Sequence, residues 1–297
     1  MRKKVFITGE QGNLAYYLSR MFDDEHFEIV WSYQRQIRAF CNRKALFGSE
    51  LDITDIKAVR GALGFTNPDI IIHTAAVVGT ERCSNFEFEA FATNVLGTYN
   101  ILKSMQQKTK MVYFSTTATY KPTKFLITES SERDPQTVYG KTKYIGELLV
   151  KQMATKPLII LPCFIFGGER DYTVSAIARL ARNFNLGNPR VEILNLNLEK
   201  KKDYMYVTDF VEAVYQLVKK NVTGEYNISA GRPLAFGYIL RDIIRRGLMQ
   251  YELRSGEDYL GDHIVGNEKL RKAIPKWRPV VTLGEGIDKV FNEDAKR

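Results

Sequence analysis

Short runs of consecutive apolar residues alternate, along the first half of the chain, with longer stretches in which apolar positions recur every three or four residues. Continuous apolar runs are typical of strands covered on both faces, and the longer spacing is typical of helices. The predicted strands are "KVFIT" (4–8), "FEIVWSY" (27–33), "PDIIIHTAA" (68–76), "KMVYFSTTA" (110–118) and "PLIILPCFIFG" (157–167). The clearest helical pattern covers residues 88–105. Strands that alternate with helices predict a doubly wound parallel sheet of the α/β class.

The pattern becomes less regular after Gly168, where runs such as "VEILN" and "GEYNISA" no longer alternate with helices in a fixed order. We therefore expect one domain over residues 1–168. Residues 169–297 are expected to form mostly a smaller C-terminal lobe, interleaved with the end of the sheet.

The composition, 44% hydrophobic and 26% charged, is ordinary for a water-soluble chain. No apolar run approaches the roughly 18 residues that span a bilayer, and the N-terminus lacks a signal-peptide core. We therefore expect a cytoplasmic protein without membrane contact. The three cysteines form no CxxC pair and the three histidines lack metal-ligand spacing, which argues against a disulfide framework and against a metal site.

The net charge of +9 predicts an anionic partner. The basic residues are dispersed, and the densest runs are "RKK" at 2–4 and "EKKK" at 199–202. A dispersed charge suits a phosphorylated small molecule at least as well as a nucleic acid, so no nucleic acid is expected. A solvated surface is the simplest explanation for the rest of the charge.

A glycine-containing segment, "TGEQGNLA" (8–15), follows the first predicted strand and opens a helix. Gly9, Gly12 and Ala15 are small enough to let the backbone approach a pyrophosphate, and the helix N-terminus offers free N–H groups. In this strand–turn–helix context the segment predicts a dinucleotide site. The alternative is a tight turn without a ligand.

The end of the second predicted strand decides between the two nicotinamide dinucleotides, because an acid there would bind the 2′-hydroxyl of NAD. The segment "WSYQRQIR" has no acid near Tyr33 but offers Ser32, Arg35 and Arg38. These groups suit a 2′-phosphate, so NADP(H) is favoured over NAD(H). Surface arginines without a ligand are the alternative.

Tyr139 and Lys143 lie four residues apart and therefore on one face of a predicted helix, which Thr137 can cap. A phenol is a poor acid at neutral pH, and a nearby ammonium lowers its pKa. Such a pair can move a proton to or from a sugar oxygen while a hydride moves to or from nicotinamide. Thr116 and Thr117, just after a strand, can steady the carbonyl oxygen.

These motifs resemble the extended short-chain dehydrogenases/reductases, the group of nucleotide-sugar epimerases, dehydratases and reductases. The motifs follow the family's order: "TGEQGNLA" (8–15), "LDITD" (51–55), "PDIIIHTAA" (68–76), "NVLGTYNIL" (94–102), "FSTTA" (114–118), Tyr139-x-x-x-Lys143, "YVTDFVEAV" (206–214) and "GEYNISAG" (224–231). The resemblance implies a Rossmann-type sheet domain that binds NAD(P), a substrate-binding C-terminal lobe and a nucleoside-diphosphate sugar as partner. A homodimer is the candidate oligomer.

By this resemblance Tyr139 is the proton donor, Lys143 binds the nicotinamide ribose, and Thr117 matches the catalytic Ser/Thr. Asp52 would contact the adenine. The residues expected at the cofactor are Gly9, Gln11, Gly12, Asn13, Leu14, Ser32, Arg35, Asp52, Ile53, Ala75, Ala76, Asn94, Tyr139 and Lys143. Lys202, Asp209 and Arg232 are candidates for holding the nucleotide or its phosphates, although surface charge is the simpler reading of Lys202.

The residues after Thr117 bear on the reaction. The family's dehydratases carry an acid pair there, whereas this chain has Ala118 and Thr119. Elimination of water needs an acid and a base beyond the tyrosine, so a dehydratase is disfavoured. Phe164, in "LPCFIFG" (161–167), is similar to the dTDP-4-dehydrorhamnose reductases, and a preference for NADP(H) favours net reduction of a keto-sugar nucleotide.

Two alternatives stay open. The segments "YVTDFVEAV" and "GEYNISAG" are more epimerase-like, which would make the chain a C4-type epimerase with tightly held NAD. The other alternative is a non-catalytic binding or regulatory protein of the same fold. Such proteins commonly lose the tyrosine–lysine pair, which this chain keeps.

Overall fold

The structure, a computed structural model, describes residues 2–9, 12–22, 24–33, 49–171, 175–185, 190–194, 198–245, 250–254 and 262–294. The chain forms two compact units, each assembled from separate stretches of sequence. The first, here called the sheet unit, contains Met1–Thr116, Thr137–Ile160 and Val214–Glu225. The second unit contains Thr117–Gln136, Leu161–Ala213 and Tyr226–Arg297.

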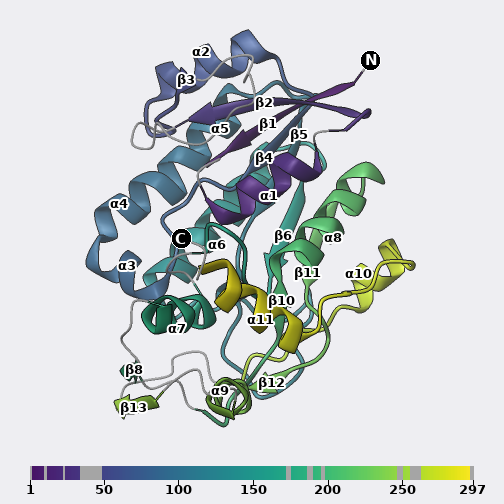
Figure 1. Cartoon of the computed structure of the whole chain (residues 1–297). Helices are drawn as coiled ribbons and strands as arrows, with labels where there is room; N and C mark the ends of the chain where they lie inside the picture. Colours follow the sequence, from purple (N-terminus) through teal and green to yellow (C-terminus); the bar gives the residue numbers. More distant parts are fainter. Residues whose placement is uncertain are drawn as a thin grey trace. The chain divides into compact units, whose positions relative to one another are not determined.

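A sheet of seven strands, counted over the described residues, has the order β11-β6-β5-β4-β1-β2-β3. The strands are β1 (Lys3–Thr8), β2 (Phe27–Tyr33), β3 (Ser49–Glu50), β4 (Ile70–His73), β5 (Lys110–Phe114), β6 (Leu158–Pro162) and β11 (Gly224–Ile228). Every neighbouring pair from β6 to β3 is parallel. The predicted α/β class with a parallel sheet is therefore confirmed (Figure 1).

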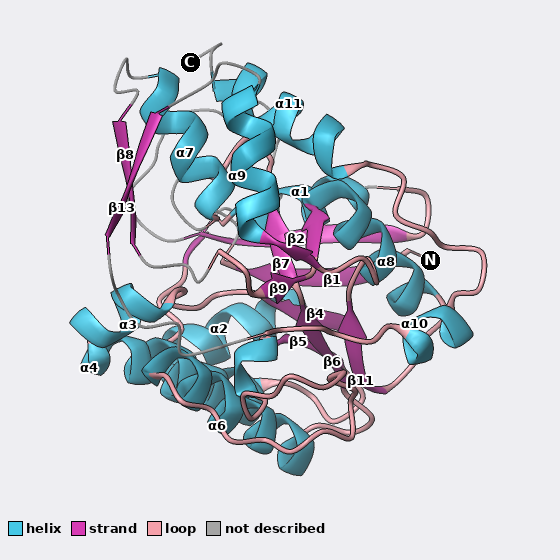
Figure 2. Cartoon of the chain, turned by 90° about the horizontal axis from the view of Figure 1, so that it is seen from below, coloured by secondary structure: helices cyan, strands magenta, loops and turns pink. Residues whose placement is uncertain are grey.

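Helices cover both faces of this sheet. Figure 2 shows α2 and α6 on one face and α1 on the other. The helices of the sheet unit are α1 (Asn13–Met21), α2 (Ile56–Thr66), α3 (Thr80–Asn85), α4 (Glu87–Phe91), α5 (Thr98–Ser104) and α6 (Val138–Met153). The sequence sets where two of them begin. The Asp55 carboxylate accepts two backbone N–H groups at the start of α2, and the Thr137 hydroxyl accepts the Gly140 N–H at 3.0 Å at the start of α6.

The strand order reverses direction at β1, which pairs with β2 on one side and with β4 on the other. Ligands of such sheets bind beyond the carboxyl ends of the strands at this reversal. Both β1 and β4 are buried along most of their length, with β4 buried throughout, so the continuous apolar runs are explained by cover on both faces.

The stretch predicted as one helix over 88–105 is divided into α4, a π-helical segment η1 (Ala92–Gly97) and α5. The buried Asn94 lies in η1, and its backbone carbonyl accepts the Thr98 hydroxyl at 2.7 Å. π-Segments inside helices are frequent at functional sites. Apolar periodicity does not distinguish a π turn from an α turn, so the sequence predicted only the helical character.

The run predicted as a single strand over 157–167 is two strands, β6 and β7 (Phe164–Phe166). Between them, the Cys163 N–H donates to the Ile228 carbonyl at 3.0 Å. Strand β7 then pairs with β10 (Tyr204–Tyr206) in a separate parallel pair. The expectation of one strand was wrong because the apolar pattern continues without interruption while the hydrogen-bonding partner changes.

The second unit is built from short pieces. It contains η2 (Thr117–Thr119), β7, α7 (Ala176–Asn185), β8 (Arg190–Leu194), β9 (Lys201–Lys202), β10, β12 (Leu234–Ala235), α9 (Phe236–Arg245), β13 (Gln250–Arg254), α10 (Glu268–Ala273) and α11 (Leu283–Asp294). Its strands pair two by two: β13 with β8 in parallel and β12 with β9 antiparallel. Helix α8 (Val207–Lys219) begins in this unit and ends in the sheet unit. Across the described stretches, no helix is both long enough and apolar enough to cross a bilayer.

Candidate active site

The glycine turn after β1 lies against the loop after β4. Gly9 has a φ of +71°, and a Cβ at this position would lie 2.7 Å from the Ala75 Cα. Only glycine fits both the backbone conformation and the contact. The Gly12 N–H donates to the Gly9 carbonyl at 2.8 Å and closes the turn. The backbone of the two loops is thus brought together at the sheet reversal.

Helix α1 begins directly after this turn. Its N-cap is Gly12, whose lack of a side chain leaves the first N–H groups of the helix without a side-chain cap. The helix dipole adds positive charge at the same end. Asn13 and Leu14, in the first turn, are partly buried. The turn and the helix end together suit the pyrophosphate of a dinucleotide.

A buried chain of hydrogen bonds ties the ends of β1 and β4 to α5. The Thr98 hydroxyl donates to the Asn94 carbonyl. The Thr98 hydroxyl oxygen can therefore accept the N–H of His73 Nε2, at 3.0 Å. His73 Nδ1 then accepts from the Thr8 hydroxyl at 2.7 Å, and Thr8 accepts the Ala75 N–H at 3.1 Å. Burial first, and the charge of Lys143 second, lower the pKa of His73 from 6.5 to about 3, so the imidazole is neutral.

Asn94 holds the next part of the loop. Its side chain accepts the Val77 N–H at 2.8 Å and donates to the Val77 carbonyl and to the Thr142 hydroxyl, both at 3.0 Å. The amide is fully buried, so these bonds fix the loop that follows Ala75 and Ala76 against α6. The Asn94 side chain therefore joins this loop to α6, and its expected place at the cofactor stays a prediction.

Asp52 and Ile53 lie between β3 and α2. The exposed carboxylate of Asp52 accepts the Thr54 N–H and hydroxyl, both at 2.8 Å. Ile53 is buried, and its backbone carbonyl accepts the Asn100 amide at 2.9 Å. The loop is therefore held by α5, and an exposed carboxylate remains at its surface.

Lys143 is almost entirely buried, with an exposed fraction of 2%. Its ammonium nitrogen lies 4.2 Å from the centroid of the Tyr113 ring. Burial lowers the pKa of Lys143 from 10.5 to about 7, although the Glu147 carboxylate opposes this shift. Lysine at this position is thus divided between its charged and neutral forms near neutral pH.

Tyr139, one helical turn before Lys143, is partly buried and packs against Val77, Cys83 and Ala90. Its phenol hydrogen-bonds Thr116, which lowers its pKa, but burial is the larger effect and raises the pKa of Tyr139 above its ordinary value of 10. We expected the neighbouring ammonium to lower this pKa. The net direction is opposite, because desolvation of the phenolate and the nearby Cys83 raise the pKa by more than the Thr116 hydrogen bond lowers it.

Two further side chains, Glu147 and Cys83, lie close enough to Tyr139 or Lys143 to affect their pKa values. The sequence motifs did not point to either of them as part of the site. Glu147 is fully buried and accepts the Ser115 hydroxyl. It lies four residues after Lys143, so the i, i+4 spacing that pointed to Lys143 could also have identified it. The Cys83 thiol donates to the Val77 carbonyl at 3.4 Å, and burial raises its pKa to about 11.

Thr117 and Thr116 have different surroundings. Thr116 belongs to the sheet unit and bonds the Tyr139 phenol. Thr117 is buried in the second unit, where its hydroxyl donates to the Pro162 carbonyl at 3.1 Å. The hydroxyl that the sheet unit brings to Tyr139 is thus that of Thr116, and the catalytic role expected for Thr117 stays a prediction.

The remaining expected residues divide into two sets. Gln11, Arg35 and Arg38 lie outside the described residues, and for Ser32 only the backbone, in β2, is described. In the second unit, Lys202 is buried with its ammonium 5.2 Å from the Phe164 ring centroid. Asp209 is buried and accepts the Val281 N–H at 2.9 Å, whereas Arg232 is exposed.

In the part of the chain that the structure describes, no three His, Cys, Asp or Glu side chains gather as a metal site would need.

Comparison with known proteins places this arrangement in context. Residues 5–229 match the family described as the NAD dependent epimerase/dehydratase family. The spore coat polysaccharide biosynthesis protein SpsK of Bacillus subtilis is 26% identical over 229 residues, 76% of this chain and 73% of that protein. The dTDP-4-dehydrorhamnose reductase of Aggregatibacter actinomycetemcomitans is 26% identical over 227 residues, 75% of this chain and 69% of that protein. A Methanocaldococcus jannaschii protein named "Putative UDP-glucose 4-epimerase" is 28% identical over 310 residues, 97% of each chain.

Solved structures share the fold over nearly the whole chain. RMD from Pseudomonas aeruginosa, complexed with NADPH, has a TM-score of 0.82 at 17% identity and covers 100% of this chain and 99% of its own. The UDP-glucose 4-epimerase of Thermus thermophilus, complexed with NAD, has a TM-score of 0.83 at 20% identity and 98% coverage of each chain. The shared architecture thus accommodates both dinucleotides.

Proposed function

The chain belongs to the NAD dependent epimerase/dehydratase family, and we propose that it is a reductase that uses NADPH to reduce a keto-sugar carried on a nucleoside diphosphate. The family match confirms the resemblance drawn from the sequence motifs and the expected enzyme class. The main observation in support of this reaction is the placement of Tyr139 and Lys143 on one face of α6. The Thr116 side chain is hydrogen-bonded to the Tyr139 phenol.

The glycine turn fits a dinucleotide, because a Cβ at Gly9 would fill the space against Ala75 and because Gly12 leaves the start of α1 uncapped by any side chain. When bound, the nicotinamide supplies a hydride to the carbonyl carbon of the sugar. Around it, Asn94 and the Thr8–His73 pair hold the loop after β4 in place.

Tyr139 donates its phenolic proton to the carbonyl oxygen as that oxygen gains negative charge. The raised pKa keeps the proton on the phenol at neutral pH until this transfer. Thr116 orients the phenol by its hydrogen bond, and the ammonium form of Lys143 stabilises the phenolate that remains. One hydride and one proton convert the ketone into the alcohol.

Reduction is favoured over dehydration by the residues after Thr117. Ala118 has no ionisable group, and the Thr119 hydroxyl accepts the Arg133 guanidinium at 2.6 Å. Elimination of water needs an additional acid and base, which neither residue supplies. A dTDP-4-dehydrorhamnose reductase and a dTDP-D-glucose 4,6-dehydratase are both among the relatives, at 26% and 24% identity, so this choice rests on the two residues.

Epimerisation is the second candidate. It is favoured by the Methanocaldococcus jannaschii relative, whose name is that of an epimerase and which matches 97% of this chain. An epimerase removes a hydride and returns it within one cycle, whereas a reductase consumes one hydride per turnover.

The test compares two mixtures. In the first, 4-keto-6-deoxy sugar nucleotides are incubated with NADPH, and we expect one NADPH oxidised per product molecule. In the second, hexose nucleotides are incubated without added cofactor, and we expect no change. Interconversion of hexose epimers in the second mixture, with no NADPH oxidation in the first, would assign the epimerase instead.

Cofactor choice is tested separately. NADPH should bind more tightly than NADH, because Arg35 can contact the 2′-phosphate and no acid stands at the end of β2. Arg35→Ala should narrow this preference, and Arg20→Ala, a change of an exposed arginine on α1, serves as the control. Fluorescence titration measures both affinities. If the unmodified chain binds NADH more tightly than NADPH, the proposed cofactor preference is wrong and the epimerase is the better assignment.

A further inference from the structure

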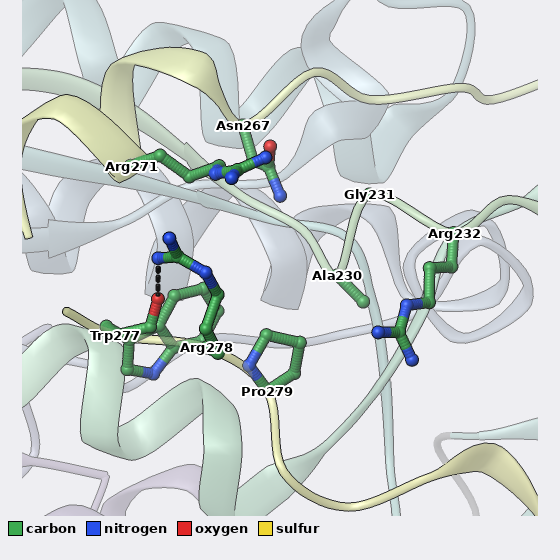
Figure 3. Close-up of a pocket in the computed structure, with 8 residues that line it drawn as sticks. All are labelled: Ala230, Gly231, Arg232, Asn267, Arg271, Trp277, Arg278 and Pro279. Atoms are coloured by element: carbon green, nitrogen blue, oxygen red, sulfur yellow. Dashed lines mark hydrogen bonds between the residues drawn. The ribbon is translucent and has the colours of Figure 1, made fainter. Parts of the chain in front are cut away.

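A cavity of about 310 Å³ lies within the second unit, between the turn after β11 and the segment that follows α10. Three arginines line it: Arg232 in the turn, Arg271 on α10 and Arg278 after it (Figure 3). Figure 3 shows Arg271 and Arg278 on one side of the cavity and Arg232 on the other. None of the residues that line the cavity is acidic.

The three guanidinium groups place three positive charges around one cavity. All three side chains are exposed, and within the described stretches none of them pairs with a carboxylate. The surrounding segment adds charge of the same sign through Lys269, Lys272 and Lys276. Like charges gathered around a hollow raise the local concentration of anions.

The walls of the cavity are held in place before any ligand binds. The buried Asp203 carboxylate accepts the Ala230 and Arg232 N–H groups at 2.7 and 2.8 Å, so both of its oxygens are engaged by the turn. Gly231 has a φ of +70°, and a Cβ there would lie 2.9 Å from the Asn267 amide nitrogen. The turn therefore requires glycine and is fixed against the start of α10.

Arg278 is also fixed. Its Nη1 donates to the Trp277 carbonyl at 2.6 Å and to the Pro275 carbonyl at 2.8 Å. These bonds occupy one nitrogen of the guanidinium and leave the others for a ligand. A guanidinium held by the backbone loses less entropy when it binds than a mobile lysine does.

Trp277 provides an independent sign of a ligand. Its ring lines the cavity and is 97% buried, since its exposed fraction is 3%. The indole N–H has no hydrogen-bond partner in the part of the chain that is described. Buried donors of this kind nearly always have a partner, and an acceptor bound in the cavity is the candidate for it.

We propose that this cavity binds the phosphate or pyrophosphate group of a small organic anion. Guanidinium forks match phosphate oxygens in pairs, and the volume lies at the lower end of that of small-molecule sites. A free phosphorylated metabolite and a nucleoside-diphosphate sugar share this chemistry. The proposal goes beyond the reaction proposed above and does not depend on it.

The test titrates inorganic pyrophosphate into the full chain, both alone and with an excess of NADPH, the proposed ligand of the glycine turn. Calorimetry should show saturable binding. The double variant Arg271→Gln/Arg278→Gln should bind at least ~10-fold more weakly, since two charge-assisted contacts are lost. The matched control is Lys272→Gln/Lys276→Gln, which removes the same charge from exposed positions of the same segment outside the cavity and should bind almost as the unmodified chain does.

A second measurement needs no change in the cavity. The chain has two tryptophans, so its nitrogen–proton spectrum holds two indole signals, and Trp31→Phe identifies the signal of Trp277. Pyrophosphate should shift the Trp277 signal saturably. Equal weakening in both double variants, no saturation, or an unmoved Trp277 signal would each overturn the proposal.

The source of the phosphate is read from the same variants with UDP-glucose and dTDP-glucose. If Arg271→Gln/Arg278→Gln weakens the binding of the two sugar nucleotides by the same factor as it weakens the binding of pyrophosphate, the cavity holds the pyrophosphate of the substrate itself. If their binding is unchanged, the cavity serves a separate phosphorylated ligand. Both results support the site, and neither depends on whether NADPH is oxidised.

Discussion

At the residue scale, the proposed chemistry rests on two side chains whose proton affinities are changed by burial in opposite directions. Burial raises the pKa of the Tyr139 phenol, and it lowers the pKa of Lys143 to about 7. Both shifts favour the neutral form, as expected for groups removed from water. Without ligands, the site therefore holds a phenol that keeps its proton and an amine that is only partly charged.

Replacement of Tyr139 by phenylalanine removes the proton and keeps the ring. Turnover should fall by roughly 10²–10⁴, the usual contribution of a general acid, while the unfolding transition stays in place. Tyr144→Phe, on the same helix and also partly buried, is the matched control and should retain activity. Turnover close to that of the unmodified enzyme in Tyr139→Phe would remove the residue from the mechanism.

The lowered pKa of Lys143 makes stability depend on pH. Between the folded value of about 7 and the unfolded value of 10.5, the unfolded chain binds more protons than the folded chain, so stability rises with pH. From pH 7 to pH 9 this gain amounts to roughly 1–3 kcal/mol. Lys143→Met should lose that gain, and Lys141→Met, an exposed change on the same helix, should keep it. Urea unfolding at several pH values measures the difference, and identical slopes in both variants would contradict it.

At the scale of elements, the important contact is the one between the π-helical segment η1 and the loop after β4. A single buried amide, that of Asn94, binds both backbone groups of Val77 and the hydroxyl of Thr142. It joins η1, the loop and α6, the helix that carries Tyr139 and Lys143. The geometry of the loop after β4 and that of helix α6 therefore depend on the same side chain.

Asn94→Ala should lower the free energy of unfolding by about 2–4 kcal/mol, because it leaves buried backbone groups of Val77 without partners. Cofactor affinity should fall as well, since the loop after Ala76 loses its anchor. Asn85→Ala, at an exposed position near the end of α3, should change neither quantity. Urea unfolding and cofactor titration test both expectations. If Asn94→Ala affects stability alone, the proposed link to the cofactor site is wrong.

At the scale of the whole molecule, the sheet was the part most readily predicted. Strands β1, β2, β4 and β5 lie inside the sheet, and such strands leave a continuous apolar run that the sequence displays directly. The break between β6 and β7 at Cys163 could not be predicted. Both strands are equally apolar, and they differ only in the strand with which each pairs, β5 for β6 and β10 for β7.

The candidate site was predictable to the extent that it is local. The spacing of Tyr139 and Lys143 gave their common helix face, and the glycine spacing gave the turn. Burial is set by residues far away in the sequence, so the direction of the Tyr139 shift was missed. The cavity of three arginines was missed for the same reason, since Arg232 and Arg271 belong to segments that are far apart in the sequence.

The interleaving of the two units limits how such a protein can be recombined. The chain passes from one unit to the other after Thr116, Gln136, Ile160, Ala213 and Glu225. A chimera made with one crossover between two homologous genes would therefore mix parental sequences inside at least one core, wherever the crossover falls between the first and last of these points. Exchange of the second unit as a whole needs a crossover at every junction. A C-terminal half of the chain therefore cannot be swapped as one intact unit.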